Sequence, residues 1–308
     1  YLCHEPIRHY RAWHAVRINE PYEPVYPSIH PWASRHLGAW GTCMNSVLNK
    51  VAGLGTTVIE KLLHLGYAMR MFWAMLLQFK VWFTRTRLLM RQIHFLGNYS
   101  LVIMVVSAAF IGAVLALQAY YALSKVGSEA ATGVMVTLSL IRELSPVVVA
   151  ILFAGRAGTS MTAEIGLMKS GEQLAAMEMM GVDPIEREYA PRFWAGGLVV
   201  PMLTMIFSLV GIYGGYLVAV RWLGVDAGVF WNMIHENVDV SHDIFRGSFV
   251  KSVVFGLAVS FIAVYEGAQS HPTPEGVAKA TTRTVVKSSL LVLALDFVLT
   301  ALMFSPQN

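Results

Sequence analysis

Long apolar runs, interrupted by few charges, dominate the chain after residue 98. Five of them, at 99–124, 130–155, 193–220, 244–265 and 284–304, reach the length at which an α-helix crosses a bilayer, which is roughly 20 residues. The first and third runs contain no charged residue at all. This pattern predicts an all-α integral membrane protein with about five transmembrane helices.

A sixth apolar stretch, at 62–79, is ambiguous. It is rich in Leu, Met, Phe and Trp, but Arg70 interrupts its middle and several basic residues follow it. The stretch is either a short span or an amphipathic helix in the membrane interface, and the central charge favours the interface. We therefore predict an interfacial amphipathic helical region over 44–98, followed by a transmembrane domain over 99–308.

Residues 1–43 differ in character from the rest of the chain. The Pro-rich string at 21–27 is incompatible with a regular helix, since Pro lacks the backbone donor, and the first Met is Met44. We interpret 1–43 as an irregular, non-native extension, such as a tag or a translated upstream segment. The alternative is an ordered tail that binds a partner.

Lys and Arg gather on one side of the predicted bundle. They lie before the first run, between the second and third, and between the fourth and fifth, at Arg85, Arg87, Arg91, Arg156, Lys169, Arg187, Arg192, Lys279, Arg283 and Lys287. Because cytoplasmic segments carry an excess of these residues, the N-terminus is predicted inside and the C-terminus outside. On the outer side, Phe230, Trp231 and Ile234 predict a short interfacial helix within 226–243.

The composition narrows the class of function. Apolar residues make up 56% of the chain, charged residues 14%, and the net charge is only +4, which excludes the basic surface that nucleic-acid binding needs. The sequence contains no G-x-x-x-x-G-K-[ST] loop for nucleotide phosphates and neither the HExxH nor the GxSxG string of hydrolases. These absences give no sign of a cofactor, metal or catalytic residue in this chain. A transporter subunit, a scaffold for partner subunits and an intramembrane lipid-modifying enzyme remain open at this point.

Four charged residues lie inside the predicted spans: Arg142, Glu143, Lys251 and Asp296. An unpaired charge there costs roughly 2.5 to 3.5 kcal/mol, so we expect pairs between helices, such as Arg142 with Asp296 and Glu143 with Lys251. Two roles remain open for this set, a structural ion-pair network or the polar lining of a substrate path. Lys251, near the outer end of its span, is expected to take the more exposed role.

Prolines and glycines within the spans carry two further predictions. Pro146 and Pro201 are expected to kink their helices, and neighbouring groups must then satisfy the carbonyls that lack a backbone donor. Gly211, Gly214 and Gly215 predict close approach of another helix.

The segment between the second and third runs, at 156–192, predicts a cytoplasmic helix. The block 162–180 is free of Pro and carries an apolar stripe at near-helical spacing, and Gly181 with Pro184 indicates its end. This helix is either a connector packed on the bundle or a docking surface that fits a groove of another subunit.

Several long strings, in order along the chain, resemble the MlaE family of ABC transporter permeases. They are LSLIRELSPVVVAILFAGRAGTSMTAEIGLMK, EQLAAMEMMGVDP, PRFWAG and ATTRTVVKSSLLVLALDFVLTALMF, and the resemblance runs from about Met44 to Phe304. It implies the permease of a system that moves phospholipids between the inner and outer membranes of a bacterium and so maintains outer-membrane lipid asymmetry.

The same resemblance implies the partners. They are a second copy of the chain in the inner membrane, an ATP-binding subunit that holds ATP and Mg, a hexameric MCE-domain protein on the periplasmic side, and a STAS-domain protein bound to the ATPase. On this reading the cytoplasmic helix couples the permease to the ATPase. The residues that the resemblance assigns to coupling are Glu164, Lys169, Glu172, Leu174, Met177, Glu178, Gly181 and Asp183.

Overall fold

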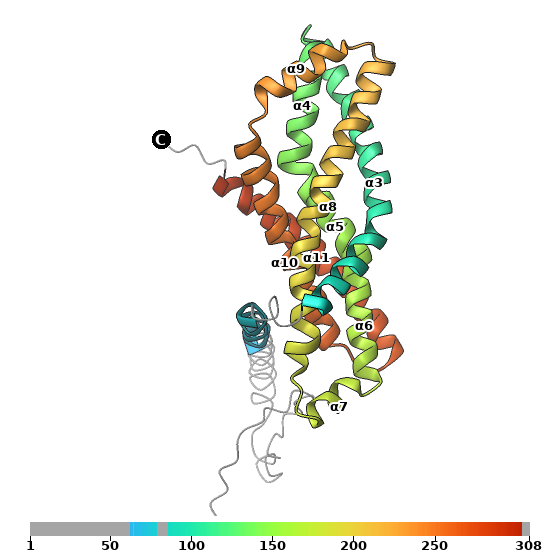
Figure 1. Ribbon diagram of the computed structural model, residues 1–308, viewed down its shortest axis with the longest axis vertical. Helices are drawn as coiled ribbons and strands as arrows, with labels where there is room; N and C mark the ends of the chain where they lie inside the picture. The colour runs from blue at the N-terminus through green and yellow to red at the C-terminus, as the bar shows by residue number, and fades with distance from the viewer. Residues whose placement is uncertain (1–61, 64, 79–85, 304–308) are drawn as a thin grey trace, which may run out of the picture. The chain divides into compact units, whose positions relative to one another are not determined.

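The computed structural model describes residues 62, 63, 65–78 and 86–303, without the side chains of 240–243 and 246 (Figure 1). Within these ranges all regular structure is helical and there is no strand. Five helices are long and apolar enough to cross a membrane: Thr86–Ser124, Glu129–Ser170, Ile185–Trp222, Gly247–Ala268 and Pro274–Met303. The all-α, multi-pass fold predicted from the apolar runs is therefore confirmed. The prediction for 1–43 lies outside the described residues.

The first and last of the five long helices, α3 (Thr86–Ser124) and α11 (Pro274–Met303), are regular α-helices. The other three combine α-helix with wider π-helical turns, and the second also begins with a 3₁₀ turn, η2 (Glu129–Ala131). The second helix consists of η2, α4 (Thr132–Ser139), η3 (Leu140–Leu144), α5 (Ser145–Phe153), η4 (Ala154–Gly158) and α6 (Thr159–Ser170). The third consists of η5 (Ile185–Tyr189), α8 (Ala190–Tyr216) and η6 (Leu217–Trp222), and the fourth of the end of η7 (Val240–Val250) and α10 (Lys251–Ala268).

Small residues let α3 and α8 lie side by side (Figure 1). On α3, Ala108, Gly112 and Ala116 are buried one turn apart. A Cβ atom on Gly112 would lie 1.9 Å from the carbonyl oxygen of Gly211, and one on Gly214 would lie 2.6 Å from that of Ala109. Both distances are too short for any side chain, so the predicted close approach at the α8 glycines is confirmed.

The described part of the ambiguous stretch 62–79 contains a helix at Leu65–Leu77. One face packs on the bundle, where the Phe72 ring meets those of Phe193 and Phe261 at centroid distances of 6.0 and 5.1 Å. Leu62, Met69, Trp73 and Leu77 are exposed. This two-faced packing favours the interfacial interpretation.

The cytoplasmic helix predicted over 162–180 is in fact two helices. α6 ends at Ser170, and α7 occupies Gln173–Met179. Between them Glu172 adopts a left-handed backbone with φ of 56°, and its N–H donates to the carbonyl of Lys169 at 3.1 Å. The single-helix prediction was wrong because Gly171, a residue that favours helix ends, provides the stop ten residues before Gly181.

The predicted helix on the outer side is present as α9 (Ala227–Asn237). Asp226 caps it, since its Oδ1 atom accepts a hydrogen bond from the Val229 N–H at 2.9 Å. Phe230 is fully buried against Gly133 of α4, where a Cβ atom would lie 2.9 Å from the Phe230 ring. The helix is therefore anchored to the bundle by one aromatic side chain.

Candidate functional site

Three of the charged residues predicted inside the spans meet at one point of the structure. The Nζ atom of Lys251, the first residue of α10, lies 3.4 Å from Oε1 of Glu143 in η3 and 3.3 Å from Oδ1 of Asp296 in α11. It also donates to the hydroxyl of Thr300 at 2.7 Å and to the backbone carbonyl of Arg142 at 3.0 Å. We call Glu143, Lys251, Asp296 and Thr300 the intramembrane cluster.

The pairing agrees in part with the examples given from the sequence, which left it open. The suggested contact of Glu143 with Lys251 is present, and Asp296 pairs with Lys251 as well. Thr300 was not foreseen. Its hydroxyl lies 3.5 Å from Oε2 of Glu143, so it bridges the lysine and the carboxylate. Thr300 lies one helical turn after Asp296, so both side chains are on one face of α11. This spacing is the feature of the sequence from which Thr300 could have been predicted as a member of the cluster.

The exposure of the cluster is opposite to the expectation for Lys251. The Lys251 side chain is 0% exposed, that of Asp296 21% and that of Glu143 44%. The prediction that Lys251 takes the exposed role is wrong, because its ammonium lies between η3 and α11, where four oxygen atoms surround it. A buried cation is tolerated only with such partners. The polar group that faces outward is the Glu143 carboxylate.

A second polar site joins α6, α8 and α10 at the end of the bundle that is predicted to be cytoplasmic. Arg192 of α8 is only 3% exposed and pairs with Glu188 at 2.6 Å and with Glu164 of α6 at 3.2 Å. Lys169, also on α6, donates to the carbonyl of Ala268 at the end of α10 at 2.8 Å. Two of the residues assigned to coupling, Glu164 and Lys169, thus make contacts inside the chain. They fix α6 to α8 and α10.

The other residues assigned to coupling gather around α7. Leu174 is buried and Met177 half-buried, whereas Glu172, Glu178, Gly181 and Asp183 are exposed. Gly181 has a φ of 74°, and the Oδ1 atom of Asp183 accepts from the N–H of Ile185 at 2.9 Å, so both shape the turn into η5.

The most exposed apolar residues of this region were not among the predicted ones. Met179 and Met180, at the end of α7, are 90% and 71% exposed. Large apolar side chains this accessible are typical of a surface that binds another protein. Their position at the tip of α7, directly before the Gly181 turn, was the signal in the sequence.

Buried threonines link α6 to α10 and α11. The hydroxyl of Thr162 on α6 contacts that of Thr284 on α11 at 2.8 Å and donates to the carbonyl of Ala263 on α10 at 2.9 Å. Both threonine side chains are fully buried. These two hydrogen bonds join α6 to α10 and α11.

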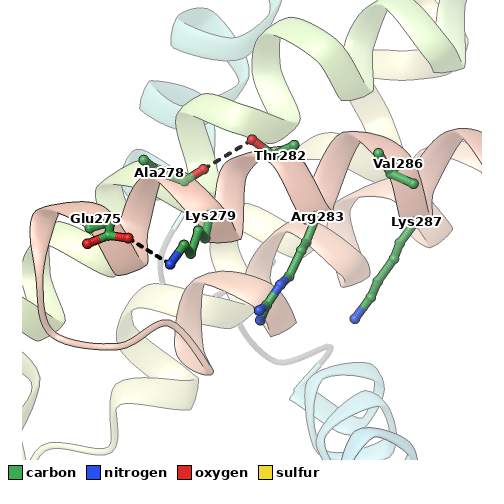
Figure 2. A pocket seen from close by; sticks show the side chains of 7 residues that line it. All are labelled: Glu275, Ala278, Lys279, Thr282, Arg283, Val286 and Lys287. Atoms are coloured by element: carbon green, nitrogen blue, oxygen red, sulfur yellow. Dashed lines mark hydrogen bonds and ion pairs between the residues drawn. The ribbon is translucent and has the colours of Figure 1, made fainter.

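A shallow depression of about 540 Å³ runs along the first half of α11 (Figure 2). Figure 2 shows Lys279, Arg283 and Lys287, one turn apart, pointing to the same side of the helix. Lys279 pairs with Glu275 at 2.7 Å, and Lys287 pairs with the buried carboxylate of Glu266. Among the described residues, no group of three or more His, Cys, Asp or Glu side chains is arranged to hold a metal ion.

Comparisons with known proteins agree on one family. The model of the family described as Permease MlaE matches residues 89–302. The intermembrane phospholipid transport system permease protein MlaE of Haemophilus influenzae is 50% identical over 258 residues, which are 84% of this chain and 98% of that protein. A probable ABC transporter permease protein of Rickettsia typhi is 38% identical and one of Synechocystis 35%, each over 70% of this chain and over 83% and 81% of the relative.

Proposed function

Since the chain belongs to the MlaE permease family, we propose that it is the membrane subunit of an ABC-type transporter that moves phospholipids between the inner and outer membranes of a bacterium. The relative from Haemophilus influenzae is named for phospholipid transport, and others are named as probable ABC transporter permeases. The membrane subunit of such a system provides the route for the lipid.

The observation that carries this proposal is the exposed carboxylate of Glu143. It belongs to a helix that crosses the membrane, yet its side chain is 44% exposed. A carboxylate in contact with acyl chains costs several kcal/mol, so ionisable groups in spans face water-filled cavities or polar ligands. We infer that this side of the cluster lines the route of the lipid headgroup.

The cluster suits this role because its charges are fixed. Lys251 neutralises much of the charge on Glu143 and Asp296, which lowers the cost of keeping them inside the membrane. Glu143 still presents an oxygen surface to the route, where it binds water or the ammonium group of a zwitterionic headgroup. The headgroup thus meets a hydrated surface partway through the membrane, while acyl chains remain against the apolar helix faces.

The energy comes from another polypeptide in this proposal. The sequence has no phosphate-binding loop, so ATP and Mg bind to a separate ATP-binding subunit. That subunit docks on the exposed surface around α7, and its movement reaches the spans through α6. Arg192, Thr162 and Lys169 fix α6 to α8, α10 and α11, which is what a rigid lever requires.

The further partners of the proposal are a second copy of the chain, a hexameric MCE-domain protein on the periplasmic side, and a STAS-domain protein bound to the ATPase. The chain lies in the inner membrane with its N-terminus in the cytoplasm and its C-terminus in the periplasm. Arg87, Arg91, Arg187 and Lys279 lie at the starts of the first, third and last long helices, and the positive-inside rule favours a cytoplasmic location for that end of the bundle.

Reconstitution of the complex tests the function. Vesicles that contain the chain and its ATP-binding subunit should transfer fluorescent phospholipid to an acceptor membrane or lipid-binding protein only when ATP is present. ATP hydrolysis without lipid transfer, unaffected by added lipid, would indicate a scaffold. Chemical change of the lipid itself would indicate an enzyme, and either result would refute the proposal.

A further inference from the structure

Two buried threonine hydroxyls lie where α6 meets α10 and α11. The Oγ1 atoms of Thr162 on α6 and Thr284 on α11 are 2.8 Å apart, and both side chains are 0% exposed. The Thr162 Oγ1 atom also lies 2.9 Å from the carbonyl oxygen of Ala263 on α10. The acceptors to which the two hydroxyls donate therefore decide whether hydrogen bonds join the three helices at this point.

Each hydroxyl also has an acceptor within its own helix. The carbonyl oxygen of Gly158 lies 3.0 Å from Oγ1 of Thr162, and that of Ala280 lies 3.0 Å from Oγ1 of Thr284. A threonine in a helix commonly donates to the carbonyl four residues before it. All of these distances occur in one arrangement of the side chains, so only the hydroxyl hydrogens have to rotate for the partners to change.

The two hydroxyl hydrogens thus have two complete sets of acceptors. In the joined set, Thr284 donates to Oγ1 of Thr162, and Thr162 donates to the carbonyl of Ala263. In the separate set, each hydroxyl donates to the carbonyl of its own helix. A buried donor without an acceptor costs about 1 to 3 kcal/mol, and neither set leaves one. For these hydroxyls, α6 can leave α10 and α11 without that cost.

The other polar contacts of α6 described above can exchange their partners for water. Glu164, which pairs with Arg192, is 34% exposed, and Arg192 keeps Glu188 as its second partner. Lys169, which donates to the carbonyl of Ala268, is half-buried. Ion pairs that reach solvent contribute little to stability, because water replaces the partner. The threonine pair is fully buried, so its two sets of acceptors take the place of that water.

A π-helical turn lies directly before α6. This turn, η4 (Ala154–Gly158), separates α6 from α5, and its last residue is Gly158, whose carbonyl is the acceptor for Thr162 in the separate set. Helices change direction at such turns, which are frequent at functional sites. The turn therefore allows α6 to change its angle to α5 once the threonines donate within their own helices.

We propose that Thr162 and Thr284 form a latch that joins α6 to α10 and α11 in one stage of the transport cycle and releases α6 in another. The inference rests on the proposed function, in which the ATP-binding subunit moves α6. ATP binding by that subunit opens the latch, and α6 turns about η4. After hydrolysis the latch closes, and the returning α6 carries α10 and α11 with it.

Disulfide trapping tests the latch. Cys3 and Cys43, the two cysteines of the chain, are replaced by Ser, and the variant with Thr162→Cys and Thr284→Cys is placed in vesicles with the ATP-binding subunit. Sulfur atoms at the positions of two oxygens 2.8 Å apart are close to the disulfide bond length of about 2 Å, so an oxidant should link them without nucleotide. A non-hydrolysable ATP analogue should slow this linkage by about tenfold, as expected if the latch is then closed in about a tenth of the molecules.

Lipid transfer by the linked protein shows whether the latch must open. The disulfide holds α6 on α11, so ATP-dependent transfer should be lost after oxidation and return when a reductant is added. The same oxidant should leave the two single-cysteine variants active, which excludes damage to the ATP-binding subunit.

Removal of one hydroxyl distinguishes a latch from a structural contact. Thr162→Val keeps nearly the same shape and removes the hydrogen bonds of the joined set. ATP hydrolysis should continue, while the lipid transferred per ATP falls by about three- to tenfold, as expected for the loss of one hydrogen bond. Thr162→Ser should behave as the wild type. Thr137→Val removes a buried hydroxyl that has no hydrogen-bond partner among the described residues, and should leave transfer per ATP unchanged.

Four results would overturn the inference. They are an absence of linkage without nucleotide, linkage at the same rate with and without the ATP analogue, full lipid transfer by the linked protein, and a Thr162→Val variant that loses stability but transfers as much lipid per ATP as the wild type. A complex that transfers no lipid, but whose cysteines link more slowly with the analogue, would refute the proposed function and leave the latch standing.

Discussion

The Nζ atom of Lys251 lies 3.0 Å from the carbonyl oxygen of Arg142, the oxygen that would accept from residue 146 in a regular helix. Residue 146 is a proline and has no N–H to give. The lysine of another span thus donates to a carbonyl that cannot receive the α-helical hydrogen bond from residue 146, as the sequence analysis expected of a neighbouring group. One side chain thereby stabilises both the proline-containing segment and the two carboxylates of the cluster.

This relationship predicts a large loss of stability when Lys251 is replaced. Lys251→Met leaves Glu143 and Asp296 without their cation and the Arg142 carbonyl without its donor, and should lower the free energy of unfolding by about 3 kcal/mol. Thermal unfolding of the purified protein measures the loss. Adding Glu143→Gln and Asp296→Asn to the same variant should recover most of it. A single variant as stable as the wild type would show that the cluster does not hold the spans together.

Close packing of α3 on α8 predicts that a single methyl group at Gly112 is harmful. Gly112→Ala places Cβ against the Gly211 carbonyl, at 1.9 Å before relaxation, and the forced separation should cost about 1 to 3 kcal/mol. Gly155→Ala is the matched control, since a Cβ there meets no atom within 4 Å. Folded yield after detergent extraction and the thermal midpoint report the difference. Equal behaviour of the two variants would contradict the packing described.

The Arg192 site predicts that two ion pairs at the same end of the bundle contribute differently to the free energy of unfolding. Arg192→Met removes a buried guanidinium from two carboxylates and should destabilise the protein by about 1.5 to 3 kcal/mol, less than a fully buried pair because Glu164 and Glu188 are partly exposed. Lys279→Met breaks a pair whose members are both exposed, and should change stability by about 0.5 kcal/mol or less. Chemical denaturation of the two variants in parallel tests this order, and the reverse order would refute it.

The exposed methionines of α7 predict the docking surface for the ATP-binding subunit. Met179→Asp combined with Met180→Asp should weaken co-purification of that subunit by roughly tenfold, as expected when an apolar anchor is lost. Val126→Asp, which adds one charge to an equally exposed apolar position at the other end of the bundle, should leave it intact. Pull-down of the subunit at graded concentrations measures the effect. Undiminished binding by the double variant would place the docking surface elsewhere.

The sequence predicts the spans well because the bilayer acts as a uniform apolar solvent. A run such as 193–220 must be helical so that its backbone N–H and C=O groups are hydrogen-bonded. It must also be long enough to cross the hydrocarbon core, whatever it packs against. The close approach of another helix at the α8 glycines could also be predicted, because small residues in membrane helices typically lie where a neighbouring helix packs closely. These features depend on local composition, which one chain displays directly.

Other features depend on information that the sequence does not display. The π-helical turn at Leu140–Leu144 has no residue pattern of its own, and it helps to decide where Glu143 points. The depth of a residue in the membrane can be counted along its span, but the direction in which its side chain points cannot be read from the sequence. For this reason Lys251 was expected to be exposed, whereas its side chain is buried. The left-handed residue Glu172 is an uncommon choice for that conformation, which left Gly171 as the only indication of the break between α6 and α7.

The central claim is that the outward face of Glu143 lines the route of the phospholipid. Glu143→Gln keeps the size of the side chain and its contact with Thr300, and it removes the charge. ATP-dependent phospholipid transfer by vesicles that contain the variant and its partner subunits tests the claim most directly. We predict that transfer slows by about tenfold, equivalent to about 1.4 kcal/mol, while assembly with the ATP-binding subunit is unchanged and Glu275→Gln, at an exposed carboxylate of α11, behaves as the wild type. Transfer by Glu143→Gln at the wild-type rate would contradict the account.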